Sequence, residues 1–241
     1  MRVAIITGAG RGIGAAVARR LARDGFAVIV DYAREENVAR ELVDAITRDG
    51  GRALAIAADV SDPDAMHALF DQTEAAYGGV DVLINNAGIM LRAPISESDD
   101  ALFDRTIAIN LKGVFNGLRE AARRLRKGGR IVSFSSSVVG LYQPTYAVYA
   151  ATKAGVEAMS HVLAKELRGR NITVNVIAPG PTATELFLKD KTKEMVDALA
   201  KAAPLERLGE PEDIANAVSF LVGPDGGWVN GQVLRVNGGI I

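Results

Sequence analysis

The 241-residue sequence contains no cysteine and only two histidines. The absence of cysteine excludes disulfide bonds, thiolate zinc sites and cysteine nucleophiles. The histidines, His67 and His161, lie in unrelated helical segments with no second ligand nearby. The sequence therefore disfavours both a histidine-based metal site and a Ser-His-Asp triad. We expect both side chains to be structural or on the surface, with no metal ion bound.

The sequence also has little net charge and no long apolar run. A formal net charge of −1 gives no electrostatic indication of a nucleic acid or an anionic membrane as partner. No apolar stretch approaches the roughly 20 residues that are needed to cross a bilayer. The strand-like run that begins at Arg2 leaves no room for a signal peptide. We expect a cytoplasmic protein that acts on a small molecule.

Short apolar runs alternate with amphipathic helical stretches along most of the chain. Such runs are typical of strands buried on both faces, and the helical stretches between them are long enough for right-handed crossovers. We predict one α/β domain over residues 1–241, a Rossmann-type, doubly wound parallel sheet of about seven strands with helices on both faces. The expected strands are 3–7, 27–30, 53–57, 82–84, 131–134, 173–177 and 232–235. The longest predicted helices are Ala101–Arg126 and Val148–Arg168.

The alternation breaks only after Pro179. The segment Gly180–Pro211 contains one predicted helix, Lys191–Ala203, between loop signals. An irregular segment beside the strand ends is either a substrate lid or an ordinary crossover connection. We take residues 184–203 as the candidate lid.

A glycine-rich loop, Thr7-Gly-Ala-Gly-Arg-Gly-Ile-Gly14, directly follows the first predicted strand and opens the first helix. Glycines let the backbone turn tightly and approach a pyrophosphate, whose charge then lies at the positive end of the helix. Between a buried strand and a helix, this loop predicts a dinucleotide site.

The stretch Gly129–Lys153 combines a predicted strand, a serine cluster, a loop and a helix. That helix carries Tyr149 and Lys153 at positions i and i+4, on one face. A tyrosine ordinarily titrates near pH ~10, and a nearby ammonium lowers its pKa into a range useful for acid–base catalysis. Tyr142 and Tyr146 have no lysine four residues later, and we interpret them as pocket wall or loop packing.

Several motifs together resemble the short-chain dehydrogenase/reductase family, and its 3-oxoacyl-[acyl-carrier-protein] reductases in particular. They occur in the family's order along essentially the whole chain: TGxxxGxG from Thr7, Asp59-Val60, Asn85-Asn-Ala-Gly88, Asn110-Leu-Lys-Gly, Tyr149-Ala-Ala-Thr-Lys153 and Pro179-Gly180. The resemblance implies reduction of a ketone to a secondary alcohol by hydride transfer, and a homotetramer or homodimer.

The resemblance also implies the catalytic roles. Tyr149 donates or accepts the proton, Lys153 lowers its pKa and holds the nicotinamide ribose, and Asn110 holds a water of the proton relay. For the serine, the family's S-x-x-G turn points to Ser137, whereas its usual separation of thirteen residues from the tyrosine points to Ser136. We favour Ser137, because the turn geometry is better fixed than the loop length. The serine would stabilise charge on the substrate oxygen.

The end of the second predicted strand bears on the choice of nicotinamide. An acidic residue there bonds the adenosine 2′-hydroxyl and repels a 2′-phosphate. Counted as in the family, that position is Tyr32, and strand alternation turns Asp31 away from it. Arg11 and Arg34 can meet a phosphate. NADP(H) is therefore favoured over NAD(H), although a register error of one residue would reverse this preference.

The full set of predicted cofactor contacts is Gly8, Gly10, Arg11, Gly12, Ile13, Gly14, Tyr32, Arg34, Asp59, Val60, Asn86, Ala87, Gly88, Tyr149, Lys153, Pro179, Gly180, Thr182 and Thr184.

Two other functions fit the same motifs. One is an NAD-dependent alcohol or sugar dehydrogenase, and the other is a catalytically silent dinucleotide-binding sensor.

Overall fold

Seven parallel strands form the central sheet in a computed structural model, which describes residues 1–189 and 191–241. Their spatial order is β3-β2-β1-β4-β5-β6-β7. The strands are β1 (Val3–Ile6), β2 (Ala27–Tyr32), β3 (Arg52–Ala57), β4 (Val82–Asn85), β5 (Arg130–Phe134), β6 (Thr173–Pro179) and β7 (Val233–Val236). The predicted doubly wound α/β fold is thus confirmed.

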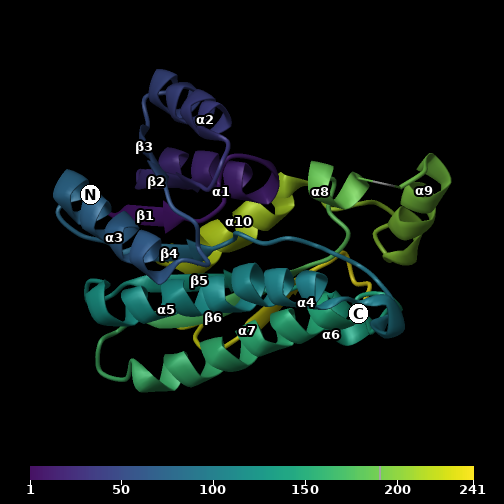
Figure 1. Cartoon of the computed structure of the whole chain (residues 1–241). Coiled ribbons are helices and arrows are strands. Elements are labelled where there is room, and N and C mark those ends of the chain that lie inside the picture. Colours follow the sequence, from purple (N-terminus) through teal and green to yellow (C-terminus); the bar gives the residue numbers. More distant parts are fainter. Residues whose placement is uncertain (190) are drawn as a thin grey trace.

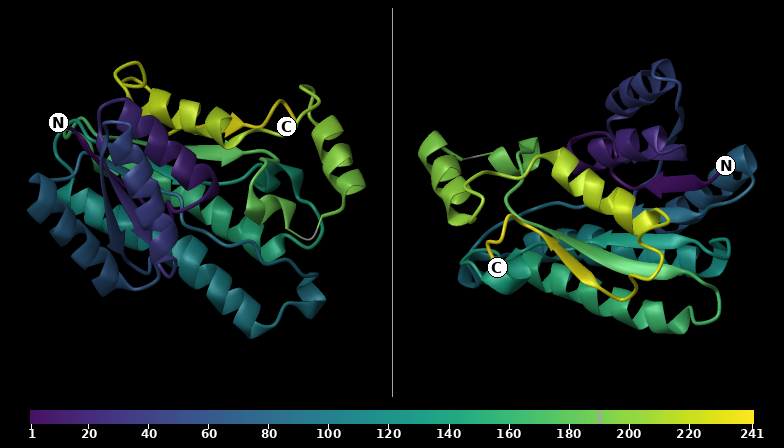
Figure 2. Two further views of the ribbon diagram at one scale, coloured as in Figure 1. Left: turned by 90° about the horizontal axis from the view of Figure 1, so that it is seen from above. Right: turned by 180° about the vertical axis from the view of Figure 1, so that it is seen from behind.

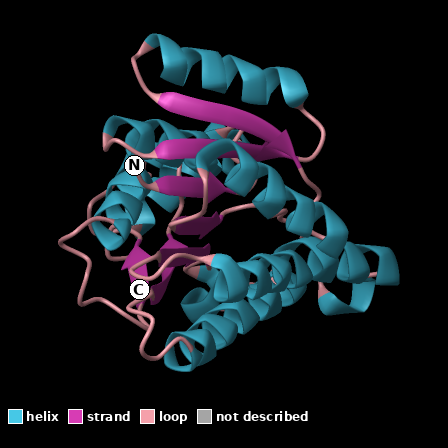
Figure 3. Ribbon diagram, turned by 90° about the vertical axis from the view of Figure 1, so that its left-hand side faces the viewer, coloured by secondary structure: helices cyan, strands magenta, loops and turns pink. Residues whose placement is uncertain are grey.

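Helices cover both faces of this sheet (Figures 1 and 3). One face packs against α1 (Gly12–Arg23), α2 (Glu36–Arg48) and α10 (Pro211–Val222). The other face packs against α3 (Pro63–Tyr77), α5 (Gly113–Arg124) and α7 (Ala147–Glu166). The inner strands are buried on both sides, and all four residues of β1 are 0% exposed. This explains why they appear in the sequence as continuous apolar runs.

The strand order reverses between β1 and β4, which are neighbours in the sheet although two strands separate them in sequence. The crossovers from these two strands run to opposite faces, α1 above and the α4–α5 connection below (Figure 1). Such a switch point leaves a crevice at the carboxyl ends of the strands, which is where ligands bind in open α/β sheets.

The predicted helix Ala101–Arg126 is not one regular helix. It consists of α4 (Asp100–Thr106), a π-helical segment η2 (Ile107–Lys112) and α5. Hydrophobic periodicity alone gives no sign of a π-helical turn, because the apolar face continues through it. A short 3-10 helix, η1 (Ile95–Glu97), precedes α4.

The irregular region after Pro179 holds two helices where the sequence predicted one. They are α8 (Glu185–Leu188), which was missed, and α9 (Lys193–Ala202), which begins two residues later than predicted because Thr192 caps it. Asp190 lies outside the described residues. Figure 2 shows α8 and α9 at one end of the molecule, set apart from the helices that cover the sheet. A further short helix, α6 (Val138–Leu141), follows the serine cluster.

Candidate active site

A cleft of about 660 Å³ opens at the carboxyl ends of the strands. Residues that follow β1 to β6 line it, together with side chains from α4, α7 and the α8–α9 region. Its position is the one expected from the switch point between β1 and β4. Its lining residues extend from the glycine loop to the serine cluster.

The glycine loop fits the pyrophosphate of a dinucleotide. Arg11 precedes α1 without a side-chain cap, so the first backbone amides of the helix are free to meet an anion. A Cβ at Gly14 would lie 2.6 Å from Asn86 Nδ2 and 2.7 Å from Gly8 O, so no side chain fits between loop and strand. A Cβ at Gly12 would stand 3.4 Å from Thr184 Cγ2, at the cleft.

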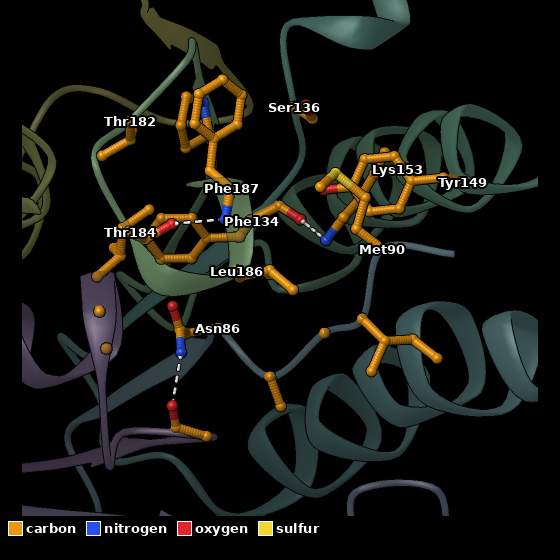
Figure 4. A pocket seen from close by; sticks show the side chains of 18 of the residues that line it. Asn86, Met90, Phe134, Ser136, Tyr149, Lys153, Thr182, Thr184, Leu186 and Phe187 are labelled. Atoms are coloured by element: carbon orange, nitrogen blue, oxygen red, sulfur yellow. Dashed lines mark hydrogen bonds between the residues drawn. The ribbon is translucent and has the colours of Figure 1, made fainter. Parts of the chain in front are cut away.

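Asn86 holds the glycine loop in place. Its side-chain Nδ2 donates to the carbonyl oxygens of Thr7, at 2.9 Å, and of Gly8, at 3.0 Å. Thr7 Oγ1 in turn accepts from the backbone amides of Asn86 and Ala87. Neighbouring Asn85 is buried and donates to Ser133 Oγ on β5. The two asparagines therefore tie β4 to its neighbours in the sheet, and Asn86 also lines the cleft (Figure 4).

Lys153 ties α7 to the end of β5. Its side chain is 4% exposed, and Nζ donates to the carbonyl oxygen of Phe134 at 2.8 Å (Figure 4). Because burial disfavours the charged form, the pKa of Lys153 falls to about 8. One turn earlier, the Tyr149 ring lies with its centroid 5.6 Å from Nζ. The two side chains thus lie side by side at the cleft, as the i, i+4 spacing predicts.

The pKa of Tyr149 differs from the expectation. Burial raises the pKa of this phenol to about 12, while a hydrogen bond with Ser136 opposes the rise. The expected lowering by Lys153 is therefore not produced by the side chains of this chain alone. Desolvation of the phenol is the larger effect, while the Lys153 ammonium donates its hydrogen bond to Phe134 O.

Each of the three serines has a different partner. Ser135 Oγ donates to Glu157 Oε1 on α7 at 2.5 Å. Ser137 is 2% exposed, and its Oγ contacts Ala178 O at 3.4 Å and accepts from Asn237 Nδ2 at 3.1 Å. Ser136 Oγ accepts from Val138 N at 3.4 Å, and of the three serines only Ser136 lies close enough to Tyr149 to lower its pKa.

All three serines line the cleft, and their contacts favour Ser136 over Ser137 as the serine beside the phenol. Ser137 begins the turn into α6, as the S-x-x-G pattern suggested, but its hydroxyl faces β6 and the C-terminal segment. Ser136 takes the place beside the phenol, in agreement with the separation of thirteen residues. We therefore assign to Ser136, as a proposal, the role that the sequence gave to Ser137.

Asn110 is fully buried in the π-helical segment and does not line the cleft. Its Oδ1 accepts from Ile89 N and its Nδ2 donates to Ile89 O, both at 2.8 Å. The side chain therefore holds the segment after β4. A Cβ on Gly88 would lie 3.3 Å from Asn110 Oδ1 and 3.7 Å from Lys153 Nζ, so Gly88 lies close to both groups. The relay role of Asn110 stays a prediction.

At the other end of the cleft, the structure overturns the prediction for β2. Asp31 lines the cleft, whereas Tyr32 does not and packs toward the α1 and α2 side of the sheet. Asp31 shares the opposite face with Ile29, and at the strand end this face opens into the cleft. Side chains alternate along β2 as predicted, but Asp31, and not Tyr32, lies on the face that borders the cleft.

Asp31 is an unusual carboxyl group. Its Oδ2 accepts from Gly8 N at 3.1 Å, and its Oδ1 is buried with no hydrogen-bond partner among the described residues. Burial raises the pKa of Asp31 to about 7, an effect that the Gly8 amide opposes and the charge of Asp59 adds to. Asp59 accepts from Ser61, which lowers the pKa of Asp59.

Two arginines line this end of the cleft. Arg11 forms ion pairs with Glu35 and, at 3.0 Å, with Glu185 of α8. Arg34 forms no ion pair or hydrogen bond within the part of the chain that the structure describes, and its charge lies close enough to Asp59 to lower the pKa of that acid. Arg34 is therefore the freer of the two cations to meet a phosphate.

The serine end of the cleft is largely apolar. In Figure 4, Leu186 and Phe187 of α8 lie across the pocket from Tyr149, Lys153 and Met90. Leu199 of α9 also lines the cleft, whereas Leu188 and Met195 do not. Thr184 Oγ1 caps α8 by accepting from Phe187 N. The predicted lid segment 184–203 thus contributes directly to the wall.

Most of the predicted contacts lie together along this cleft. The exceptions are Gly10, Tyr32 and Asn110, which do not line it. Gly10 faces Val38 on α2 instead. Lining residues outside the predicted site set include Asp31, Ser136, Ile89, Met90, Val138 and Leu141. Ser136 had a signal in the sequence, since its distance from Tyr149 had pointed to it.

Comparison with known proteins defines the family. The model of the family described as Enoyl-(Acyl carrier protein) reductase matches residues 8–241. A "Short-chain type dehydrogenase/reductase" of Picea abies is 44% identical, over 99% of this chain and 92% of its own. An "NADPH-dependent aldehyde reductase-like protein, chloroplastic" of Arabidopsis thaliana is 43% identical, over 100% of this chain and 94% of its own.

Comparison with solved structures supports the same family. The crystal structure of a short-chain dehydrogenase from Burkholderia cenocepacia J2315 in complex with NADP superposes with a TM-score of 0.94 at 38% identity, covering 99% of this chain and 97% of that one. The chain belongs to the short-chain dehydrogenase/reductase family and is an oxidoreductase of that family.

The buried ammonium of Lys153 leads to a prediction on stability. Because the folded-state pKa is about 8 and the unfolded value is 10.5, the unfolded chain binds more protons between these values. Stability of the wild type should therefore gain on the order of 3 kcal/mol at most as pH rises through this window. Lys153→Met removes this gain, so its thermal midpoint should move down relative to wild type from pH 7 to pH 10.

The matched control is Lys165→Met, which removes an exposed lysine of the same helix. Its midpoint should keep a constant offset from that of the wild type. Parallel pH profiles for Lys153→Met and wild type would show that the ammonium of Lys153 is not desolvated.

Proposed function

We propose that this protein is an NADP(H)-dependent reductase that converts ketones to secondary alcohols, with 3-oxoacyl thioesters or carbonyl compounds of similar shape as substrates. The observation that carries the proposal is the position of Tyr149, which lies close to Ser136 and beside Lys153, at the apolar end of a cleft that begins at a glycine loop. The NADPH-dependent aldehyde reductase-like relative supports a carbonyl substrate.

The residues of the chain suit the reductive direction. A reduced nicotinamide, when bound, would supply the hydride that the carbonyl carbon needs. The Ser136 hydroxyl orients the carbonyl oxygen and stabilises the charge that develops on it. The Tyr149 hydroxyl then gives its proton to that oxygen, which completes the alcohol. A pKa of about 12 keeps Tyr149 protonated at neutral pH, so the proton donor is present before the reaction.

Lys153 acts on the phenolate that remains after proton transfer. Its Nζ lies near the Tyr149 ring and is fixed by Phe134 O. An ammonium at this place stabilises the phenolate and so favours the transfer. The glycine loop and the first turn of α1 hold the pyrophosphate, while Asp59 and Val60 border the adenine end.

A second candidate, an NAD-linked alcohol dehydrogenase on the same scaffold, is favoured by one observation. Asp31 Oδ1 is buried at the adenosine end with no partner among the described residues, and a ribose hydroxyl would satisfy it. Against this stands Arg34, a cation at the same end with no ion pair to any residue that the structure describes. A sugar substrate fits less well, because the wall near Tyr149 is apolar.

The catalytic proposal predicts the effect of three variants on NADPH-dependent ketone reduction. Tyr149→Phe removes the proton donor and should lower kcat by about 10²–10⁴-fold. Ser136→Ala removes a donor to the developing oxyanion and should lower kcat by about 10²-fold or more. Ser137→Ala, the adjacent control, should cost far less, since that hydroxyl bonds Ala178 and Asn237. The measurement is loss of NADPH absorbance with a panel of ketones.

Unchanged turnover in Tyr149→Phe would remove this mechanism. A larger loss in Ser137→Ala than in Ser136→Ala would return the catalytic role to Ser137. A wild type that binds dinucleotide but reduces none of the panel would favour the silent sensor.

The choice of cofactor predicts opposite effects at two residues. Arg34→Ala should raise the Kd for NADPH by about tenfold, because a charge-assisted hydrogen bond to the 2′-phosphate is lost, and leave NADH within about twofold. Asp31→Asn removes a negative charge but keeps an acceptor for Gly8 N, so it should tighten NADPH. Arg48→Ala, an exposed site on α2, is the control. Fluorescence titration of each nucleotide provides the Kd values, and tighter binding of NADH by the wild type would overturn the preference.

We also propose a homotetramer in the cytoplasm. Two exposed apolar areas support the assembly: Phe103, Phe115 and Val162 on α4, α5 and α7, and Phe220, Trp228 and Leu234 around α10 and the edge strand β7. Trp228 is 98% exposed, and an open strand edge invites pairing. Among the described residues, no helix has the length and apolar character that a bilayer span requires.

Sedimentation or light scattering should therefore give four times the mass of the 25.4 kDa chain. Val162→Glu should reduce the assembly to a smaller species, because it places a charge in the helical interface. Ile95→Glu, at an exposed site outside both areas, should not change the mass. A wild-type monomer at micromolar concentration would refute the proposal.

A further inference from the structure

Tyr146 is a second tyrosine at the catalytic end of the cleft. It precedes α7, is 9% exposed and lines the cleft. Its ring meets that of Tyr149 edge-on, with centroids 6.3 Å apart and an interplanar angle of 68°. The family motifs give this residue no part, and the sequence led us to interpret it as pocket wall. Its surroundings indicate more.

Arg92, on the loop after β4, holds the Tyr146 hydroxyl. Its Nη1 donates to Tyr146 Oη at 3.3 Å, and its guanidinium carbon lies 5.4 Å from the ring centroid. The two segments are tied together by a backbone hydrogen bond from Ala93 N to Thr145 O at 3.1 Å. The backbone hydrogen bond therefore helps to hold the Arg92 guanidinium over the Tyr146 ring, in addition to the side-chain contacts of Arg92.

This arrangement leaves the proton of Tyr146 available. A phenol has one O–H donor and lone pairs that accept. Arg92 takes up the accepting side, and no described residue accepts the proton. A donor hydrogen bond from a cation also polarises the hydroxyl and makes it a stronger donor to the next group. A nearly buried donor without an acceptor is costly unless a ligand supplies one.

We infer that the Tyr146 hydroxyl, held by Arg92, binds a second oxygen of the substrate, so that the preferred substrates are 1,3-dicarbonyl compounds such as 3-oxoacyl esters and thioesters. This inference rests on the proposed function, because it places the ketone oxygen at Ser136 and Tyr149. The second carbonyl then meets Tyr146. The ring centroids of Tyr146 and Tyr149 lie 6.3 Å apart, so both phenols belong to the same end of the cleft.

The chemistry of recognition favours an acceptor oxygen over an apolar group. A site built to hydrogen-bond a substrate oxygen discriminates strongly against an analogue that lacks it, since the polar group of the site is then left unpaired. The rest of the wall, with Met90, Leu186 and Phe187, would accept the apolar remainder of the substrate. Tyr146 is thus a specificity-determining residue, and Arg92 is a positioning residue that acts through it.

The test compares two substrates of equal chain length with NADPH: ethyl 3-oxobutanoate and 2-heptanone, which lacks the second carbonyl. Tyr146→Phe should raise KM for the ester by about tenfold or more, with kcat within about twofold, because the lost contact is the same in the ground and transition states. For 2-heptanone, both constants should stay within about twofold. Tyr142→Phe is the matched control, since Tyr142 is 80% exposed in the same loop.

Arg92 provides the second variant. Arg92→Leu should raise KM for the ester alone, by less than Tyr146→Phe, and Arg92→Lys should recover part of the loss because it keeps a cationic donor. An equal change for both substrates, or none for either, would overturn the inference while leaving the proposed function intact. A wild type that reduces neither compound would overturn the proposed function, and the inference with it.

Discussion

The hydrogen bond from Lys153 Nζ to Phe134 O is the interaction on which the catalytic end of this protein depends. It fixes the first turns of α7 against the end of β5. Taking an ammonium out of water costs several kcal/mol unless polar groups replace the hydration. The carbonyl oxygen of Phe134, the last residue of β5, replaces part of this hydration. Tyr149, the proposed proton donor, therefore lies beside a cation that the fold stabilises only in part.

At the end of β5, three consecutive serines have different contacts. A strand places successive side chains on opposite faces, but beyond its last residue this rule no longer applies. Ser135 is drawn to α7 by Glu157, and Ser137 to the C-terminal segment by Asn237. With both neighbours anchored in opposite directions, Ser136 faces Tyr149. Sequence patterns could restrict the serine to two candidates, but the deciding partners lie 22 and 100 residues away in the chain.

Local chemistry explains what could be predicted and what could not. Buried strands, the glycine loop and the i, i+4 pair of Tyr149 and Lys153 depend on neighbours in sequence, and the structure has them where the sequence predicts. The π-helical turn at Asn110 depends on a contact with Ile89, and the facing of Asp31 depends on which side of the sheet opens into the cleft. Period-2 alternation predicts that Asp31 and Tyr32 lie on opposite faces of the sheet. Only tertiary packing determines which of the two borders the cleft.

The adenosine end shows why cofactor choice is a balance rather than a single residue. Arg11 and Arg34 would attract a 2′-phosphate, yet Glu35 and Glu185 already pair with Arg11, and Asp31 lies buried next to Asp59. Exposed ion pairs of this kind contribute about 0–1 kcal/mol, so a dianionic phosphate can displace the two glutamates from Arg11. The buried Asp31 cannot move away in the same manner, because it holds Gly8 N. Its raised pKa offers the remaining solution: a protonated Asp31 keeps the glycine loop in place without repelling the phosphate. In the proposed NADP(H) site, discrimination between the nucleotides would then depend on how much of Asp31 is ionised beside Arg34, and not on the acid alone.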